Sequence, residues 1–160
     1  MIILWSICSL AFYIVSFYLT EFPGSIYTNG ILMGIADLLV GPVTKLSTQS
    51  FSIKQIILTS LGITSAVSVA LSTIDGSIEF GYACVFLIRL NISLVFWLCY
   101  YATSELFSSD IKSRVFSICN VVARSLTLLA PIIAQTVPNA MLVVTSTWVI
   151  GILASMFLKE

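Results

Sequence analysis

The sequence contains no histidine and very few charged residues. Without histidine among its 160 residues, the chain lacks the side chain that most often binds transition metals or relays protons near neutral pH. Charged residues make up only 9% of the chain, whereas a typical soluble domain has about 25%. Because seven basic residues balance seven acidic ones, the overall charge indicates no nucleic-acid partner. These absences exclude a histidine-based metal site and argue against a soluble domain.

Motifs for catalysis are missing as well. No nucleophile stands near a candidate base, no residues have the spacing of a metal cluster, and no glycine-rich phosphate loop occurs. The four cysteines all fall in apolar stretches, so we expect no disulfide framework, and the redox compartment stays open. They are Cys8, Cys84, Cys99 and Cys119. We therefore expect a protein that is not an enzyme and that binds no cofactor or metal.

Hydrophobic residues are what the chain has in abundance, at 59% of the sequence. They gather in runs long enough to cross a bilayer, which takes about 20 residues as a helix. The runs cover approximately 2–19, 25–44, 55–73, 81–103, 115–135 and 140–158. The period-two alternation of a barrel strand is missing, so each run is expected to be a helix. The sequence predicts one all-α integral membrane domain over residues 1–160, with six transmembrane helices.

Basic residues are found on only one set of the predicted loops. That set, with the C-terminus, holds Lys45, Lys54, Lys112, Arg114 and Lys159. The opposite set holds Glu21, Asp75 and Glu79 and no lysine or arginine. Cytoplasmic loops are the ones enriched in lysine and arginine. The bias predicts that both termini face the cytoplasm, and the first span, which lacks a basic leader, is expected to remain as a helix.

Three charged residues fall inside the predicted spans, where charge is costly and normally faces a bundle interior or a cavity. Asp37 lies in the second span, Arg89 toward the outer part of the fourth, and Arg124 near the middle of the fifth. Arg89 either extends toward the outer interface or forms a paired charge at a cavity mouth. Arg124 lies too deep for that extension, so it must meet either water or an anion, which would be Asp37 or a carboxylate or similar group of a substrate.

Polar and aromatic residues accompany these charges. The fifth span has a stripe at offsets of three and four, which stays on one helix face: Ser113, Ser117, Asn120, Arg124, Thr127 and Pro131. From it we select Asn120, Arg124 and Thr127 as substrate-binding candidates, and Trp97 and Tyr100 from the fourth span. Phe17 is added from the aromatic first span, whose rings either face lipid or form a cavity wall.

The loop between the fourth and fifth spans has its own charges. Glu105 is close enough in sequence to pair with Lys112 or Arg114 across the turn, and we expect such a pair to act as a gate in one conformation. The two halves of the chain also correspond weakly. Charged spans are followed in each half by an uncharged one, and Asp37 in span two corresponds to Arg124 in span five. This pattern predicts an inverted three-plus-three repeat.

These residues also carry a resemblance to a known family. The matching positions, in order, are Arg89, Phe96, Tyr100, Glu105, Leu106, Phe107, Lys112, Arg124, Ala130 and Pro131. The segment Phe22–Asn29, FPGSIYTN, matches as well, and Asp37 falls where a glutamate is frequent. The chain resembles the second six helices of the organic cation, organic anion and carnitine transporters of the major facilitator superfamily. Those proteins have twelve spans, so the likeness covers one half of their fold.

The resemblance implies half of a secondary transporter that moves a small organic ion by alternating access, with an anion or zwitterion favoured. It implies a second six-helix half as partner, as a separate chain, a second copy or a preceding part of the same chain. It also favours the plasma membrane, with an organelle membrane as the other option. The alternative is a structural transmembrane subunit of a larger complex that retains the fold without transport.

Overall fold

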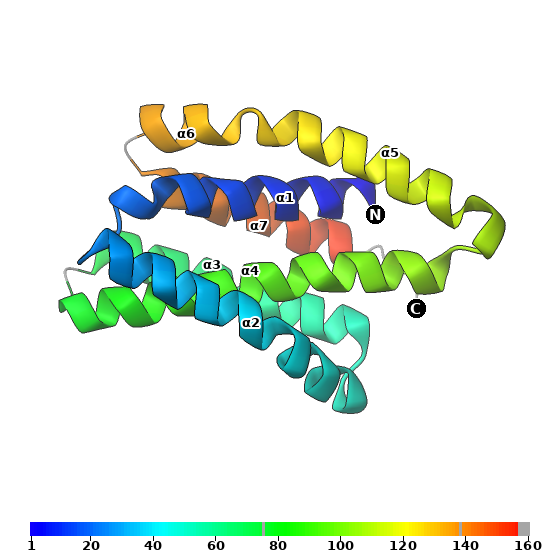
Figure 1. The fold of residues 1–160 in the computed structure, drawn as a ribbon, viewed down its shortest axis with the longest axis horizontal. Helices are drawn as coiled ribbons and strands as arrows, with labels where there is room; N and C mark the ends of the chain where they lie inside the picture. Colours follow the sequence, from blue (N-terminus) through cyan, green and yellow to red (C-terminus); the bar gives the residue numbers. More distant parts are fainter. Residues whose placement is uncertain (75, 138, 157–160) are drawn as a thin grey trace.

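The computed structural model describes residues 1–74, 76–137 and 139–156 of the chain and shows an all-α bundle (Figure 1). Its elements are α1 (Ile2–Phe17), the 3₁₀ turn η1 (Tyr18–Thr20), α2 (Ile26–Ser50), α3 (Ile53–Thr73), α4 (Ile78–Leu106), α5 (Ser109–Thr127), α6 (Ala130–Thr136) and α7 (Ala140–Met156). The predicted helical class is confirmed for this described part of the chain.

Five helical stretches are long and apolar enough to cross a membrane: Ile2–Thr20, Ile26–Ser50, Ile53–Thr73, Ile78–Leu106 and Ser109–Thr136. They identify a multi-pass membrane protein by length and composition, with lipid as the expected surroundings. The sixth predicted span, 140–158, corresponds to α7, a shorter apolar helix of 17 residues. Because residues 157 and 158 lie outside the described part, the sixth crossing stays a prediction.

The predicted boundary of the second span was wrong. The span was expected to end at residue 44, but α2 continues past Pro42 to Ser50, so most of the expected 45–54 connection is helical. The polar run that follows residue 44 marks the exit from apolar surroundings, and it contains no residue that stops a helix. The connection is short because Ser52 begins α3 at once: its hydroxyl accepts from the Gln55 N–H, and the Gln55 side chain accepts from the Ser52 N–H.

The predicted span 115–135 is divided in the structure. Its helix begins earlier, at Ser109, and α5 ends at Thr127, with Leu128 and Leu129 between it and α6. Pro131 lies in the first turn of α6, where its missing N–H costs no helical hydrogen bond. The helix is therefore interrupted before Pro131, because a proline ring clashes with the carbonyl of the helical turn that precedes it.

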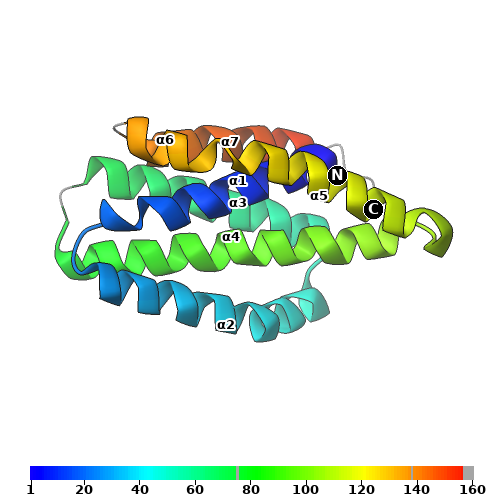
Figure 2. The ribbon, with the colours of Figure 1, turned by 45° about the horizontal axis from the view of Figure 1, so that its top comes forward.

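Helices α1 and α4 occupy the middle of the bundle. Helix α1 packs against α4, α5, α6 and α7, while α4 packs against α2 and α3, and α3 packs against α7. Figure 2 shows α2 at one edge and α5 with α6 toward the opposite edge, with α1 and α4 between them. The largest fully buried side chains include Trp5, Ile14, Leu61, Ile88 and Trp148, so the core is formed by the central helices and the α3–α7 pair.

The helix ends fall into two groups. In Figure 1 the N-terminus, the α2–α3 connection and the α4–α5 connection lie at one end of the bundle. The starts of α2, α4 and α7 lie at the other end. Lys45, Lys54, Lys112 and Arg114 belong to the first end, and Glu21 and Glu79 to the second, while Asp75 and Lys159 lie outside the described residues. The predicted grouping of charge by end is present, and its assignment to a cytoplasmic side stays a prediction.

Gly24 shapes the turn between α1 and α2, and replacing it by alanine should destabilise the fold. The residue has a φ of +90°, where side chains are rarely accommodated. A Cβ there would overlap the Tyr82 ring, whose hydroxyl accepts a hydrogen bond from the Ser25 N–H at 3.0 Å. We expect Gly24→Ala to lower the unfolding free energy by about 2 kcal/mol, from combined strain and overpacking.

The matched control for this turn is Gly30→Ala. An added Cβ at Gly30 meets no atom within 4 Å, and the position is inside helix α2. Thermal unfolding of the two purified variants in detergent compares them directly. A Gly24→Ala protein as stable as Gly30→Ala would show that the turn tolerates a side chain.

Candidate functional site

An ion pair inside the bundle joins Arg89 of α4 to Asp37 of α2. The guanidinium forms a bidentate contact with the carboxylate: Nε donates to Oδ1 at 2.9 Å and Nη2 donates to Oδ2 at 2.7 Å. This two-bond arrangement is the strong form of an arginine–carboxylate contact. The Arg89 side chain is 8% exposed and that of Asp37 is 39% exposed, so only the carboxylate remains open to the surroundings.

Neighbouring side chains complete the hydrogen bonds of this pair. The Ser93 hydroxyl donates to Asp37 Oδ1 at 2.6 Å, and Arg89 Nη1 donates to the Ser16 hydroxyl at 2.8 Å. The same nitrogen reaches the Phe12 carbonyl at 3.5 Å, and the guanidinium carbon lies 3.6 Å from the centre of the Phe12 ring. The network thus ties α1, α2 and α4 together, and it satisfies charges that would be costly alone in this apolar interior.

This pairing decides two of the alternatives left open by the sequence. Arg89 does not extend toward the interface, because its head group is buried among α1, α2 and α4. Asp37 is engaged by Arg89 and Ser93 and makes no ion pair with Arg124 in the described part of the chain. The two intramembrane charges therefore neutralise each other, and Arg124 must be considered separately.

Arg124 lies on the exposed side of α5 and meets α1 instead of a carboxylate. Its Nη1 donates to the Tyr13 hydroxyl at 2.6 Å, and its guanidinium carbon lies 5.8 Å from the Tyr13 ring centre. Tyr13 stacks in turn on Phe17, with ring centres 6.5 Å apart. Within residues 1–74, 76–137 and 139–156, no carboxylate lies at ion-pair distance from Arg124. The arginine keeps its positive charge uncompensated at the protein surface.

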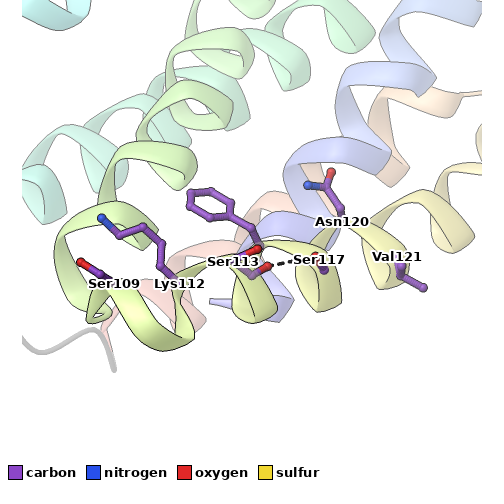
Figure 3. A pocket seen from close by; sticks show the side chains of 7 residues that line it. Ser109, Lys112, Ser113, Ser117, Asn120 and Val121 are labelled. Atoms are coloured by element: carbon purple, nitrogen blue, oxygen red, sulfur yellow. Dashed lines mark hydrogen bonds between the residues drawn. The ribbon is translucent and has the colours of Figure 1, made fainter.

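A groove of about 690 Å³ runs along the first part of α5. It is lined by Ser109, Lys112, Ser113, Phe116, Ser117, Asn120 and Val121. Figure 3 shows Ser109, Lys112, Ser113 and Asn120 along one side of this helix. Arg124 follows Asn120 by one turn, so the groove and the arginine share a polar face of α5. Cys119 and Ala123 form the buried face of the same helix.

The remaining substrate-binding candidates have different surroundings. Tyr100 packs in the core against Trp5 and Phe116, with ring centres 4.2 and 5.9 Å away, so it contributes to packing. Trp97 is 55% exposed and Phe17 is 50% exposed. The Thr127 hydroxyl donates to the Arg124 carbonyl at 2.7 Å, a contact within its own helix. Of the predicted set, the structure brings Phe17 near Arg124 through Tyr13 and places Asn120 on the same helix face.

The predicted gate residues do not contact one another in this conformation. Glu105 is exposed at the end of α4, while Lys112 lines the α5 groove and Arg114 is exposed on the next turn. Among the described residues, the ion pair of Arg89 with Asp37 is the one that occurs. A latch between Glu105 and either basic residue therefore belongs to another conformation, if it forms, and stays a prediction.

The site also uses three residues outside the selected candidates: Phe12 and Tyr13, which belong to the aromatic first span, and Ser16, which the sequence did not identify. All three lie on α1, and Ser16 follows Phe12 by four residues, which places both on the face turned toward Arg89. A polar side chain within an aromatic span was the available signal. Serine is common in membrane helices, however, so that signal alone indicates no partner.

Comparison with models of known protein families finds no match, and comparison with curated proteins finds none either. The transporter likeness therefore depends on the individual residues named above, from Phe22 to Pro131. What the structure establishes is a helical protein with five candidate membrane spans, an internally neutralised charge pair and, within the described residues, an arginine in the fifth predicted span that pairs with no carboxylate.

Proposed function

We propose that this chain is one half of a secondary transporter for a small organic anion or zwitterion. The observation that carries the proposal is the uncompensated charge of Arg124. Asp37, Arg89 and Arg124 sum to one positive charge, and the pairing of the first two leaves it on α5. Arginine in the middle of a span costs at least about 2.5 kcal/mol unless an anion or water offsets it. An anionic substrate provides that offset, whereas a plain cation would be repelled.

The exposed polar face of α5 supports the need for a second unit. Ser113, Ser117 and Arg124 are exposed on a helix that is long and apolar enough, with α6, to cross the membrane. The Ser117 hydroxyl already donates to the Ser113 carbonyl, but beyond its bond to Tyr13 the Arg124 guanidinium has further N–H groups that lipid tails cannot satisfy. This face is therefore expected to border a water-filled cavity or a polar protein surface. A second six-helix half across α5 and α2 would enclose such a cavity, as alternating access requires.

The packing pattern supports an inverted repeat of three helices. If α1 corresponds to α4, α2 to α5 with α6, and α3 to α7, the observed contacts pair up. The packing of α1 on α5 corresponds to that of α4 on α2, and that of α1 on α7 to that of α4 on α3. Two further large contacts, α1 with α4 and α3 with α7, map onto themselves, whereas the small contacts of α4 with α5 and of α2 with α3 have no counterpart of that size. Under this correspondence Asp37 and Arg124 lie on equivalent helices.

Binding of a simple aromatic anion tests the proposal. The protein, purified with any partner it retains, is expected to bind radiolabelled benzoate in preference to benzylammonium. Arg124→Ala should weaken benzoate binding by about 10- to 100-fold, the equivalent of a charge-assisted hydrogen bond of about 1.5–3 kcal/mol. Arg124→Lys should not restore it fully, because an ammonium lacks the planar two-bond fork.

Arg114→Ala is the control for this experiment. It also removes one positive charge from α5, but near the helix start rather than ten residues further along, and it should leave benzoate binding close to that of the parent. Equal benzoate binding by the parent, Arg124→Ala and Arg124→Lys would refute an anion site at Arg124.

A structural transmembrane subunit is the second candidate function. It is favoured by the position of Tyr100, which is half-buried and packs against Trp5, and by the Tyr13 hydroxyl that already accepts a hydrogen bond from Arg124. For such a subunit, Arg124→Ala would change its retention in a larger membrane complex without any effect on small anions. Co-purification and benzoate binding, measured on the same variants, separate the two functions.

A further inference from the structure

We propose that Cys8 and Cys99 form an oxidation site, in which a peroxide converts the two thiols to a disulfide between α1 and α4. The two sulfur atoms lie 3.9 Å apart, and both side chains are fully buried. They are 91 residues apart in the sequence, so the helix packing alone brings them together. Cys84 and Cys119 are also buried and free, and in the described chain neither makes a sulfur–sulfur contact like that of Cys8 with Cys99.

Contacts on both sides hold the two helices at this level. One turn before Cys8, the Trp5 indole Nε1 donates to the Thr103 hydroxyl at 3.1 Å. One turn after Cys8, the Phe12 ring stacks on Phe96 with centres 5.8 Å apart. The sulfurs therefore remain facing each other, and a disulfide requires them to approach from 3.9 Å to about 2.05 Å. Small side-chain rotations in the same seam provide this approach.

The chemistry balances with hydrogen peroxide as the oxidant. One sulfur displaces water from the peroxide and becomes a sulfenic acid, which the second thiol attacks to form the S–S bond with release of another water. The two sulfurs are oxidised and the peroxide O–O bond is reduced, giving one disulfide and two waters. The second step is fast relative to further oxidation because the resolving thiol is already in contact.

The buried position selects a small, uncharged oxidant. An apolar groove of about 620 Å³ opens at the start of α1, lined by Met1, Ile2, Ile3, Phe107, Val115 and Cys119 among others. Ile2 and Ile3 precede Cys8 by less than two helical turns. Cys8 and Cys99 do not line this groove and are fully buried, so peroxide has to reach them through a brief opening of the packing that would not admit a charged, bulky thiol reagent. Cys119 lines the groove and would be reached first, which makes it an internal reporter of access.

The consequence of oxidation is a covalent link between the two central helices. Helix α1 carries the contacts to α5, α6 and α7, and α4 carries those to α2 and α3. A disulfide between α1 and α4 therefore restrains the helices that pack on α1 as well as those that pack on α4. If the chain is half of a transporter, the bond joins equivalent helices of the proposed repeat. The oxidation itself needs no transport, so its failure and the failure of the transport proposal are separate results.

The test is peptide mapping of the purified chain in lipid nanodiscs after mild hydrogen peroxide treatment, with the remaining thiols alkylated before digestion. We expect one linked species that joins the peptides of Cys8 and Cys99 and disappears on treatment with dithiothreitol. This measurement on the parent chain needs no variant. Recovery of Cys8 and Cys99 only as free or singly oxidised residues, or linkage mainly to Cys84 or Cys119, would overturn the proposal.

Cysteine variants test whether formation of the disulfide raises the unfolding temperature. Peroxide should raise the unfolding temperature of the parent chain and of the Cys84→Ala/Cys119→Ala double variant. It should not raise that of Cys8→Ala or Cys99→Ala, each of which keeps only one thiol of the pair. A rise that persists in Cys8→Ala would show that another cysteine is responsible and would refute the pair.

Discussion

Replacing Asp37 by leucine should destabilise the bundle by about 3 kcal/mol, the usual cost of removing one partner from a buried ion pair. The reason is the arginine that remains. Arg89 is 8% exposed and donates two of its hydrogen bonds to Asp37, so Asp37→Leu leaves an unpaired guanidinium among apolar helices. Titration of the purified protein with sodium dodecyl sulfate, followed by circular dichroism, measures the loss.

Replacing Arg89 instead of Asp37 should cost less stability, as far as the charge that remains is concerned. In Arg89→Met the remaining carboxylate is 39% exposed, so it can reach water or take up a proton. Asp37→Leu combined with Arg89→Met removes both charges and should be more stable than Asp37→Leu by itself, since apolar residues often replace a buried pair without loss. If the double variant is no more stable than Asp37→Leu, the unpaired guanidinium is not the cause of the destabilisation.

Trp5→Ala should have a comparably large effect, about 3–5 kcal/mol, because it removes a fully buried large side chain and leaves a cavity. Trp5 lies against Phe96, Tyr100 and Phe116, with ring centres 6.3, 4.2 and 5.9 Å away, and its indole donates to Thr103. It therefore joins α1, α4 and α5 at one point. Unfolding in detergent, followed by tryptophan-independent far-ultraviolet circular dichroism, gives the free energy.

Trp97→Ala is the matched control for this change. Trp97 is the same residue type on α4, but it is 55% exposed and absent from the ring contacts of the core. Its replacement should change stability by no more than about 0.5 kcal/mol, as for other exposed positions. Equal losses of stability for Trp5→Ala and Trp97→Ala would contradict the prediction. They would mean either that another molecule covers the Trp97 indole or that the core does not depend on Trp5.

The sequence predicted the class and the positions of the long helices because both depend on local composition. A bilayer-length run of apolar residues has to be helical, whatever its neighbours are. Helix ends were less predictable. Polar residues after Gly41 suggested an end near residue 44, yet α2 continues to Ser50, since leaving an apolar environment does not break a helix. The break before Pro131 was predictable in its position, because proline disturbs the turn that precedes it.

The pairing of charged residues on different helices could not be predicted from the sequence. Spacing along one helix determines which residues share a face, and on that basis Asn120 and Arg124 were correctly grouped on α5. It does not determine how that face is rotated toward another helix. Asp37 and Arg89 are 52 residues apart, and their pairing depends on the packing of α2 on α4. Tyr100 was selected on the same kind of evidence; it is half-buried against Trp5 and Phe116, and its role in substrate binding stays a prediction.

The sequence by itself therefore determined that the chain has helices of membrane length, near which helix ends the basic residues gather, and which few side chains bear charge within the spans. Its composition is sufficient for this because each of these properties belongs to a short segment. Only the tertiary structure decided which charges neutralise each other, that Arg124 has no carboxylate partner among the described residues, and that Cys8 faces Cys99. These are relations between helices, and they follow from the rotation and register in which the helices pack.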